Sequence, residues 1–411
     1  MTMLDILQQI INAGAIDLLK VVTPENHLTA KELWIKDAEK GLFTNPVFTY
    51  NDRSEEARKS IVELNRIENS IPEPRNRQEE FVRNLIIDLI SKQRITANVA
   101  IAISEGDEIL TNHLLHDFYG RTDKGIVAKA YAIAGGETIT FPGLNDITQR
   151  LTKEIAEKAG KDKMGATELK GMFESVLEDY ELSDTWTVEI SDSYSAVTVK
   201  TYSEDGKSKI FIPTNKEVST ITAIKLVAHE IEAHVRHNMN CAYVLEDYFD
   251  IPHDIACRLV NDRDATLTEG FAKIADAIIE RKCTGKITGT PKPWYTIAAD
   301  LANKGESFAQ IAERLHTEYG LKLETCYMTI LRIFRGCRFT SNEHNYAREA
   351  DRCYLEGFIV ASKLFEENSP LFDYAKFDQE TFDAARQIVG SAIDEPRLVH
   401  KGVAEFIVNN L

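Results

Sequence analysis

The sequence lacks several features that would each point to a class of protein. No stretch approaches the roughly 18 uninterrupted apolar residues of a membrane-spanning helix, so we expect no membrane segment. No segment is of low complexity or repeats with a period of about 20–50 residues, which excludes solenoids and propellers. Basic residues are in deficit, since 48 Lys and Arg stand against 65 Asp and Glu, a formal charge of −17. A chain this acidic repels phosphate backbones, so we expect no nucleic-acid partner.

Cysteine is also scarce. The 411 residues include six cysteines, all in the C-terminal half and none in a C-x-x-C pair. This is far from a disulfide scaffold, so we expect buried, reduced thiols. The N-terminal segment lacks the basic start of a secretory signal and carries Asp5 inside an amphipathic helical pattern. Both observations predict a cytoplasmic protein.

The composition that is present is ordinary for a globular protein, with 43% hydrophobic and 27% charged residues. The apolar period is helical over 54–130 and from about 218 onward, whereas 186–213 contains three β-branched runs separated by turn residues. We therefore expect a predominantly helical α+β protein with a small antiparallel sheet. The turn-rich segment 134–146 predicts a division into an N-terminal helical region (1–140) and a second domain (141–411). That domain would contain strands at about 186–213, helices at about 218–280 and further C-terminal helices.

One segment, 219–240, combines a helical apolar stripe with an unusual polar motif. Its apolar side chains recur at the spacing of a single helix face: Ile221, Ile224, Ala228, Ile231 and Val235. Beside that stripe lie His229, Glu230 and His234, in the pattern H-E-x-x-x-H. Two histidines with an adjacent glutamate are the residue types of a catalytic zinc site, in which imidazoles bind the ion and the carboxylate serves as a base. Glu230 is the candidate base.

The spacing of the two histidines sets a structural condition on this interpretation. The zinc-peptidase motif separates its histidines by four residues, whereas here the separation is five. In an ideal α-helix that places the two imidazoles roughly 140° apart around the axis. A wider turn with i→i+5 hydrogen bonds would align them, and such π bulges are frequent at functional sites. We therefore predict a one-residue bulge between His229 and His234. For the neighbouring Glu232 we expect a solvated or supporting role, and for His237 a surface position.

A third metal ligand is expected from a later helix. Glu269, in 261–278, is the first candidate, with Asp264 and Asp276 as competitors. Asp264 precedes the settled helical pattern and is a candidate cap, while Asp276 lies about two turns beyond Glu269. Gly270, directly after Glu269, would let this helix approach a neighbouring backbone closely.

These segments together resemble the tyrosine carboxypeptidase family of zincin-like metallopeptidases with an H-E-x-x-x-H motif. The T-E-G-F-A segment at 268–272 is similar to the family's usual Q-E-G-L-A. The resemblance continues into R-I-F-R-G (332–336) and D-x-x-Y-L-x-G (351–357), so that it covers roughly 180 to 360. Just before Asp351, the chain has Arg348, Glu349 and Ala350 where the family has Phe-Thr-Lys, a departure at the expected substrate contacts.

The resemblance implies a function and a set of site residues. It implies one Zn²⁺ per chain, held by His229, His234 and Glu269, with Glu230 as the catalytic base. It also implies a zincin-like catalytic domain and removal of a C-terminal residue, Tyr or another aromatic, from a peptide or protein tail.

A carboxypeptidase must also bind a terminal carboxylate, which arginine does with two parallel hydrogen bonds. Arg332 and Arg335 are the nearest candidates, three apart and so expected on one helical face. Tyr354 is a candidate donor to the oxyanion of the tetrahedral intermediate. The alternative interpretations are ion-paired arginines and a buried core tyrosine.

Other functions fit parts of the pattern. A zinc dipeptidyl- or aminopeptidase or an endopeptidase would use the same site. The dipeptidyl peptidases of the third type share H-E-x-x-x-H, but their third-ligand segment resembles E-E-C-x-A-E, unlike the segment at 268–272. A non-catalytic relative acting as a binding scaffold would have no use for Glu230, so its presence favours an enzyme.

Overall fold

The computed structural model describes residues 2–12, 16–137, 163–194, 196–201, 207–260, 265–284, 291–339 and 346–399. The chain forms two compact units. The first consists of Met1–Thr138 and Lys292–Leu355, the second of Ile139–Pro291 and Glu356–Leu411. The predicted first boundary, at about 140, lies beside this division, whereas the prediction assigns 292–355 to the second domain. That assignment needs correction, because these residues group with the N-terminal region.

The described part of the first unit is helical. Its N-terminal helices are α1 (Met3–Asn12), α2 (Leu18–Val22), α3 (His27–Ala38), α4 (Ser54–Glu68), α5 (Arg77–Glu105), α6 (Glu108–Tyr119) and α7 (Lys124–Ala134). The later segment adds α15 (Trp294–Asn303), α16 (Phe308–Thr317), α17 (Leu323–Ile333) and the 3₁₀ turn η2 (Glu349–Arg352). The longest helix, α5, starts where the Asn76 side chain caps the Glu79 N–H and ends at Gly106 in the left-handed conformation.

Aromatic packing explains why 292–355 joins the first unit. The ring of Trp34, on α3, lies 5.8 Å from Phe308 of α16 and 5.5 Å from Tyr327 of α17, measured between centroids. All three side chains are buried. The Tyr327 hydroxyl also donates to the backbone carbonyl of His27, at the start of α3. Periodicity reports which face of each helix is apolar but not which partner that face finds, so this grouping was not readable from the sequence.

The second unit contains every strand that the structure describes. It begins with β1 (Lys163–Gly165), α10 (Ala166–Asp179), β2 (Trp186–Ser191), β3 (Thr198–Lys200), β4 (Ser208–Pro213) and β5 (Glu217–Ser219). Helices follow: α11 (Thr220–Val227), the π-helix η1 (Ala228–Val235), α12 (Arg236–Phe249), α13 (His253–Leu259) and α14 (Ala265–Thr284). The last elements of the chain, which follow the segment that belongs to the first unit, are α18 (Cys353–Glu366), η3 (Pro370–Asp373), α19 (Gln379–Val389) and η4 (Gly390–Asp394). The unit boundary falls within α18.

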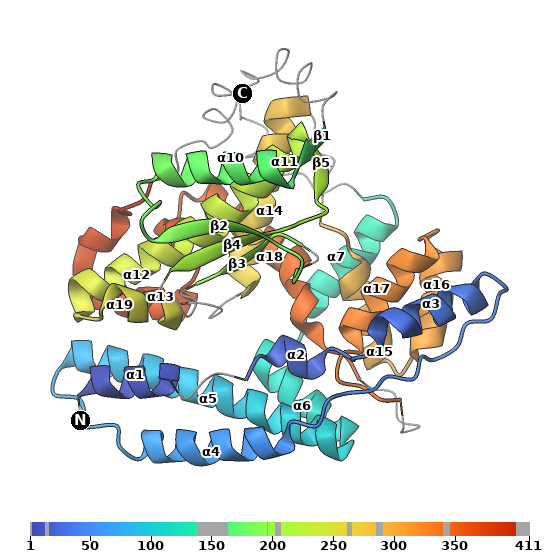
Figure 1. Cartoon of the computed structure of the whole chain (residues 1–411), viewed down its shortest axis with the longest axis horizontal. Helices are drawn as coiled ribbons and strands as arrows, with labels where there is room; N and C mark the ends of the chain where they lie inside the picture. The colour runs from blue at the N-terminus through green and yellow to red at the C-terminus, as the bar shows by residue number, and fades with distance from the viewer. Residues whose placement is uncertain are drawn as a thin grey trace. The chain divides into compact units, whose positions relative to one another are not determined.

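The three expected strands form one sheet, but its topology is mixed. The order is β2-β4-β3, with β3 antiparallel to β4 and β2 parallel to β4. A simple meander would have given an all-antiparallel sheet. Instead β4 lies in the centre, because its Ile210 and Ile212 are fully buried and need a neighbour on either side. Helix α10 lies alongside the sheet and contacts β2 and β4 (Figure 1). A separate antiparallel pair, β1 with β5, leads directly into α11.

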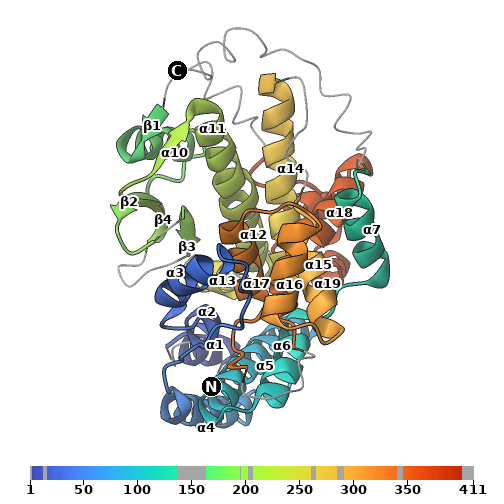
Figure 2. The same cartoon turned by 90° about the vertical axis from the view of Figure 1, so that its right-hand side faces the viewer.

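Helices α11, η1 and α14 form the packed centre of the second unit. Both α11 and η1 lie along α14, and Figure 2 shows α11 and α14 side by side. The expected apolar stripe packs here, with Ile224, Ile231 and Val235 fully buried.

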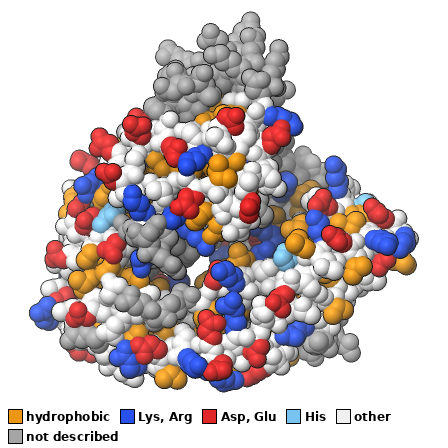
Figure 3. Space-filling model, in the orientation of Figure 1, with side chains coloured by type: hydrophobic (Ala, Val, Ile, Leu, Met, Phe, Trp, Pro, Cys, Tyr) orange, Lys and Arg blue, Asp and Glu red, His pale blue; other side chains and the backbone are white. Residues whose placement is uncertain are grey.

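All six cysteines of the chain are buried. None of the described helices has the length and apolar character needed to cross a bilayer. On the face drawn in Figure 3, acidic and basic side chains are interspersed.

Two glycines allow α14 and α18 to cross with their backbones in contact. A Cβ atom placed on Gly270 would lie 2.1 Å from the carbonyl oxygen of Gly357. One placed on Gly357 would lie 2.0 Å from the carbonyl oxygen of Thr266. Neither position has room for a methyl group. The close approach expected at Gly270 is therefore confirmed, and its partner is the glycine of the D-x-x-Y-L-x-G segment.

Replacement of Gly270 by Ala should destabilise the protein by at least about 2 kcal/mol, since backbone atoms must move to accommodate the methyl group. Gly171 on α10 is the matched control, because a Cβ there meets nothing within 4 Å. Gly171→Ala should instead stabilise the protein by about 0.5–1 kcal/mol through its higher helix propensity. Urea unfolding of both variants measures the difference. Equal stabilities would contradict the helix crossing.

Candidate metal centre

The π-helix η1 positions the two histidines of the motif. It spans Ala228–Val235, and the backbone N–H of Arg236 that follows it donates to the carbonyl of Ile231, five residues earlier. The bulge predicted from the spacing is therefore confirmed. In this wider turn the rings of His229 and His234 come to the same side, with centroids 5.3 Å apart.

Glu269 on α14 faces both histidines. Its Oε2 lies 4.0 Å from His229 Nε2, and its Oε1 lies 3.7 Å from His234 Nε2. One ligand atom from each of the three residues falls within 4.8 Å of the other two. A tetrahedral ion with bonds of about 2.0–2.1 Å separates its ligand atoms by roughly 3.3 Å. The three candidate ligand atoms are thus slightly farther apart than they would be around a bound ion. Each side chain is partly accessible, 15% for the histidines and 23% for the glutamate.

Asp276, a competitor for the third ligand position, has a different place. Its Oδ1 lies 3.5 Å from His229 Nδ1, the ring nitrogen that faces away from the ligand cluster. Its other oxygen pairs with Lys273 Nζ at 2.8 Å. A carboxylate behind a metal-binding histidine fixes the tautomer and the orientation of the ring. Asp276 is therefore placed to support His229 and lies outside the His229–His234–Glu269 group. Asp264, the other competitor, lies outside the described residues.

Burial and charge act differently on the two histidines. Burial, followed by the charge on His229, holds the pKa of His234 well below its usual range. Burial also lowers the pKa of His229, but its hydrogen bond to Asp276 and the charge of Glu230 outweigh this and leave that pKa raised. Because a metal ion binds the neutral imidazole, the lowered pKa of His234 would favour binding and the raised pKa of His229 would oppose it.

Glu230 is a buried carboxyl group beside the ligands, with 7% of the residue exposed. Burial raises its pKa to about 7. The charge of His229 opposes this shift, and the nearby carboxylates of Glu269 and Asp276 add to it. A carboxylate whose pKa lies near neutrality can both accept and return a proton, as a general base and acid must.

The donor set fits zinc. Two imidazole nitrogens and one carboxylate oxygen make a three-ligand set of the kind that leaves a fourth position for water or substrate. The contact between Asp276 and His229 supplies the support that such ligands normally have. These residues would hold the ion through His229 Nε2, His234 Nε2 and Glu269.

Sequence reasoning missed or misplaced several residues around the centre. Lys273, one turn after Glu269, is ion-paired to Asp276. Lys376 is 6% exposed, and its charge contributes to lowering the pKa of His234. The spacing of Lys273 on the ligand helix was a usable signal, whereas Lys376 lies far away in sequence. His237, expected at the surface, is buried at 1% exposure because its ring packs against Phe271.

The expected substrate-binding residues lie in the first unit, where they form a cluster of their own. Arg332 Nη1 pairs with Asp351 Oδ1 at 3.0 Å, and its guanidinium lies over the rings of Tyr295 and Tyr354. The ion-paired alternative therefore applies to Arg332. The half-buried Tyr354 ring lies 5.7 Å from that of Tyr295. Helix α17 ends at Ile333, so Arg332 and Arg335 do not share a helical face, which corrects that expectation.

Arg335 has the opposite environment from Arg332. Within the described ranges its buried Nε has no hydrogen-bond partner, and no ion pair joins its guanidinium to a carboxylate. Burial, followed by the charges of Arg348 and Arg332, lowers its pKa to about 10. A half-buried cation beside other cations is a favourable place for an anion. Of the two arginines, Arg335 has the environment suited to binding a carboxylate.

The segment that departs from the family pattern is part of the first unit's interior. Arg348 donates to the Tyr119 hydroxyl at 2.9 Å and stacks on its ring. Glu349 is 3% exposed and accepts from the Thr122 N–H at 2.6 Å and from Asn303 Nδ2 at 2.9 Å. These contacts tie η2 to its neighbours in the unit, which accounts for the polar residues at 348 and 349.

Comparison with known proteins adds no assignment. No family model matches the sequence, and no curated protein matches it.

Asp276→Asn should weaken Zn²⁺ binding by about 10- to 100-fold, because the ring of His229 loses its charged support. Glu269→Ala should abolish stoichiometric binding. Glu280→Gln is the matched control, a carboxylate one turn further along α14 that pairs with Lys225 instead. Competition with a chromophoric chelator measures all three affinities. Full zinc occupancy in the Glu269→Ala protein would return Asp264 or Asp276 to the ligand set.

The metal-free protein should lose stability as the pH rises from about 5 to 8, and Glu230→Gln should lose less. The folded-state pKa of Glu230, about 7, exceeds the reference value of 4.5, so the folded state retains a proton that the unfolded state releases. The associated stability is complete below the unfolded pKa and is lost as the pH rises through 7. The difference corresponds to about 3 kcal/mol. Urea unfolding in chelator at both pH values checks this, and equal pH slopes for the two proteins would count against a buried carboxyl.

Proposed function

We propose that this protein is a zinc-dependent metallopeptidase that removes a residue from the C-terminus of a peptide or protein. The observation that carries the proposal is the π turn of η1, which brings His229 and His234 to one side opposite Glu269. π turns are rare in proteins and are frequent at functional sites. The coincidence of this turn with two potential ligands, and with a third on a neighbouring helix, supports a metal-binding purpose.

Each residue of the centre has its own proposed role. Zinc held by His229, His234 and Glu269 would supply Lewis acidity and lower the pKa of bound water. Glu230 would take the proton of the attacking water and deliver it to the leaving amine. Its burial would limit competing contacts with bulk solvent. Asp276 would hold the imidazole of His229 in place.

The choice of a carboxypeptidase rests on the resemblance of the motif segments, and the proposed binding of the terminal carboxylate by Arg335 belongs to that resemblance. Among the described residues the Arg335 Nε has no hydrogen-bond partner, and a guanidinium can bind a carboxylate in bidentate fashion. Tyr354 remains the candidate donor to the oxyanion. The zincin-like fold and a preference for a terminal tyrosine or other aromatic belong to the same proposal. An amino- or dipeptidyl peptidase, an endopeptidase and a binding scaffold are the alternatives that activity measurements separate.

Glu230→Gln should keep its zinc and lose turnover by a factor of at least about 100, because a single acid–base group contributes about 10²–10⁴ to rate. Mass spectrometry of a defined peptide mixture, incubated with wild-type protein and with this variant, gives the result. Loss of single C-terminal residues by the wild type alone supports the proposal. Cuts at the N-terminus or inside peptides would assign the site to another peptidase class, and undiminished cleavage by the variant would refute the role of Glu230.

Arg335→Lys should raise KM about tenfold for peptides with a free C-terminus and leave their amidated counterparts nearly unchanged. Lysine keeps the charge but loses the fork that binds both carboxylate oxygens. Arg332→Lys is the matched control, since that guanidinium is paired with Asp351 and should not distinguish the two peptide sets. Equal changes for free and amidated peptides in the Arg335→Lys enzyme would exclude carboxylate recognition by this residue.

A further inference from the structure

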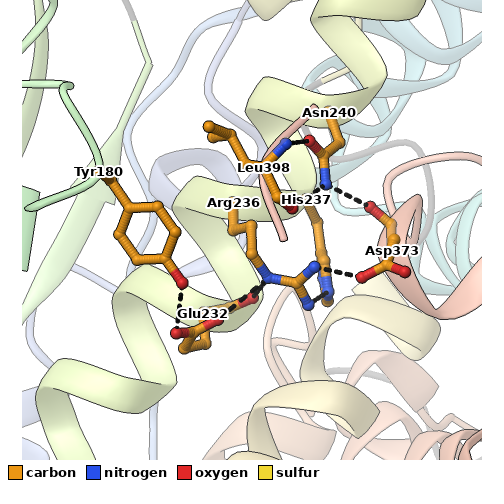
Figure 4. Close-up of polar contacts among 7 residues, drawn as sticks. All are labelled: Tyr180, Glu232, Arg236, His237, Asn240, Asp373 and Leu398. Atoms are coloured by element: carbon orange, nitrogen blue, oxygen red, sulfur yellow. Dashed lines mark hydrogen bonds and ion pairs between the residues drawn. The ribbon is translucent and has the colours of Figure 1, made fainter. Parts of the chain in front are cut away.

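A buried network of charged and polar side chains lies directly behind the π turn. Glu232, within η1, and Arg236, the first residue of α12, are 3% and 1% exposed. Figure 4 shows the Arg236 guanidinium between Glu232 on one side and Asp373 on the other. The Tyr180 hydroxyl donates to Glu232 Oε1 at 2.5 Å. The supporting role considered for Glu232 is thus the one that its surroundings favour.

The backbone ladder changes register at this point. A π turn pairs each carbonyl with the N–H five residues later, and an α-helix with the N–H four residues later, so one carbonyl is passed over where η1 gives way to α12. The Arg236 N–H still donates to Ile231, in π register. The next carbonyl, that of Glu232, accepts a hydrogen bond from the side-chain Nε of the same arginine at 3.1 Å. One residue therefore serves two consecutive carbonyls, the first with its backbone and the second with its side chain.

The rest of the guanidinium is fixed by its own partners. Nη1 pairs with the carboxylate of Asp373, and Nη2 lies 3.0 Å from His237 Nε2. Nε also lies 3.1 Å from Glu232 Oε2. With both carboxylates engaged, the side chain has little freedom to leave the Glu232 carbonyl. A buried carbonyl without a hydrogen-bond donor is unfavourable, so this contact affects the relative stability of the π and α registers.

We propose that Arg236 is a positioning residue of the metal centre, which sets the π register between His229 and His234 by capping the Glu232 carbonyl. Without that cap, the helix gains by returning to regular α register, in which the two imidazoles diverge. The inference rests on the metal centre of the proposed function, but it concerns zinc affinity and does not require peptidase activity.

A purely structural role for the network has a clear counterpart in the same helix. Asn240, one turn after Arg236, donates from Nδ2 to the carbonyls of Asp373 and Leu398 and accepts from the Leu398 N–H at 2.8 Å. It therefore fastens the same C-terminal segment to α12, and none of these three hydrogen bonds involves the π turn. Replacement of Asn240 therefore measures how much these hydrogen bonds to the C-terminal segment contribute by themselves to stability and to zinc affinity.

The test compares Arg236→Lys with Asn240→Ala. Lysine keeps the cation and removes the Nε–H. We expect Arg236→Lys to weaken Zn²⁺ binding by about 10- to 100-fold, as supporting residues of metal ligands do, and to alter the visible spectrum of bound Co²⁺ as the ligand geometry relaxes. Asn240→Ala should lower the melting temperature and leave Zn²⁺ affinity within about twofold of wild type.

If Arg236→Lys does not fold, Asp373→Asn can be compared with Asn240→Ala instead. Asp373→Asn frees one arm of the guanidinium at a partly exposed position, 25% for the side chain, and should weaken Zn²⁺ binding more than Asn240→Ala does. Zinc affinities that follow thermal stability alone across these variants would overturn the role of Arg236. Failure of the wild-type protein to bind zinc would instead contradict the metal centre and the proposed function, so the two failures are distinguishable.

Discussion

The candidate centre depends on one departure from regular helix geometry, the i→i+5 hydrogen bonding of Ala228–Val235. In α register the two histidines of H-E-x-x-x-H would point roughly 140° apart. In π register they face one carboxylate of a neighbouring helix. Several other features of the second unit serve this turn. Helix α14 brings Glu269 and Asp276 to it, and the Gly270–Gly357 crossing lets α14 pack without a gap.

The electrostatics of the centre follow from its burial. Glu230, Glu269 and Asp276 bring three carboxyl groups close to two imidazoles, with Lys273 as a nearby cation. The neighbouring carboxylates raise the pKa of Glu230 and the proton affinity of His229. A divalent cation would offset both effects, because its charge would favour an ionised Glu230 and the neutral, metal-binding form of His229. This group of carboxyl and imidazole side chains, which is electrostatically unfavourable without a metal ion, would therefore be suited to holding one.

The sequence allowed prediction of those features that depend on local spacing. The π bulge followed from the separation of His229 and His234, and the close helix contact from a glycine beside Glu269. Features set by long-range packing were not predictable in this way. The mixed sheet arises because β4 is the most buried strand, and the return of 292–355 to the first unit depends on Trp34 finding aromatic partners some 270 residues later. The role of Arg236 could not be predicted, because its side chain binds a backbone carbonyl and such a contact leaves no motif in the sequence.

The most direct test of the account is X-ray absorption spectroscopy of the zinc-loaded wild-type protein. The account predicts one zinc per chain, bound by two imidazoles and by oxygen ligands at about 2.0–2.2 Å, with no sulfur in the shell. The multiple-scattering features of imidazole should fall by half in His234→Ala protein. Zinc bound without imidazole, or an unchanged imidazole signal in that variant, would contradict the proposed centre and the purpose of the π turn.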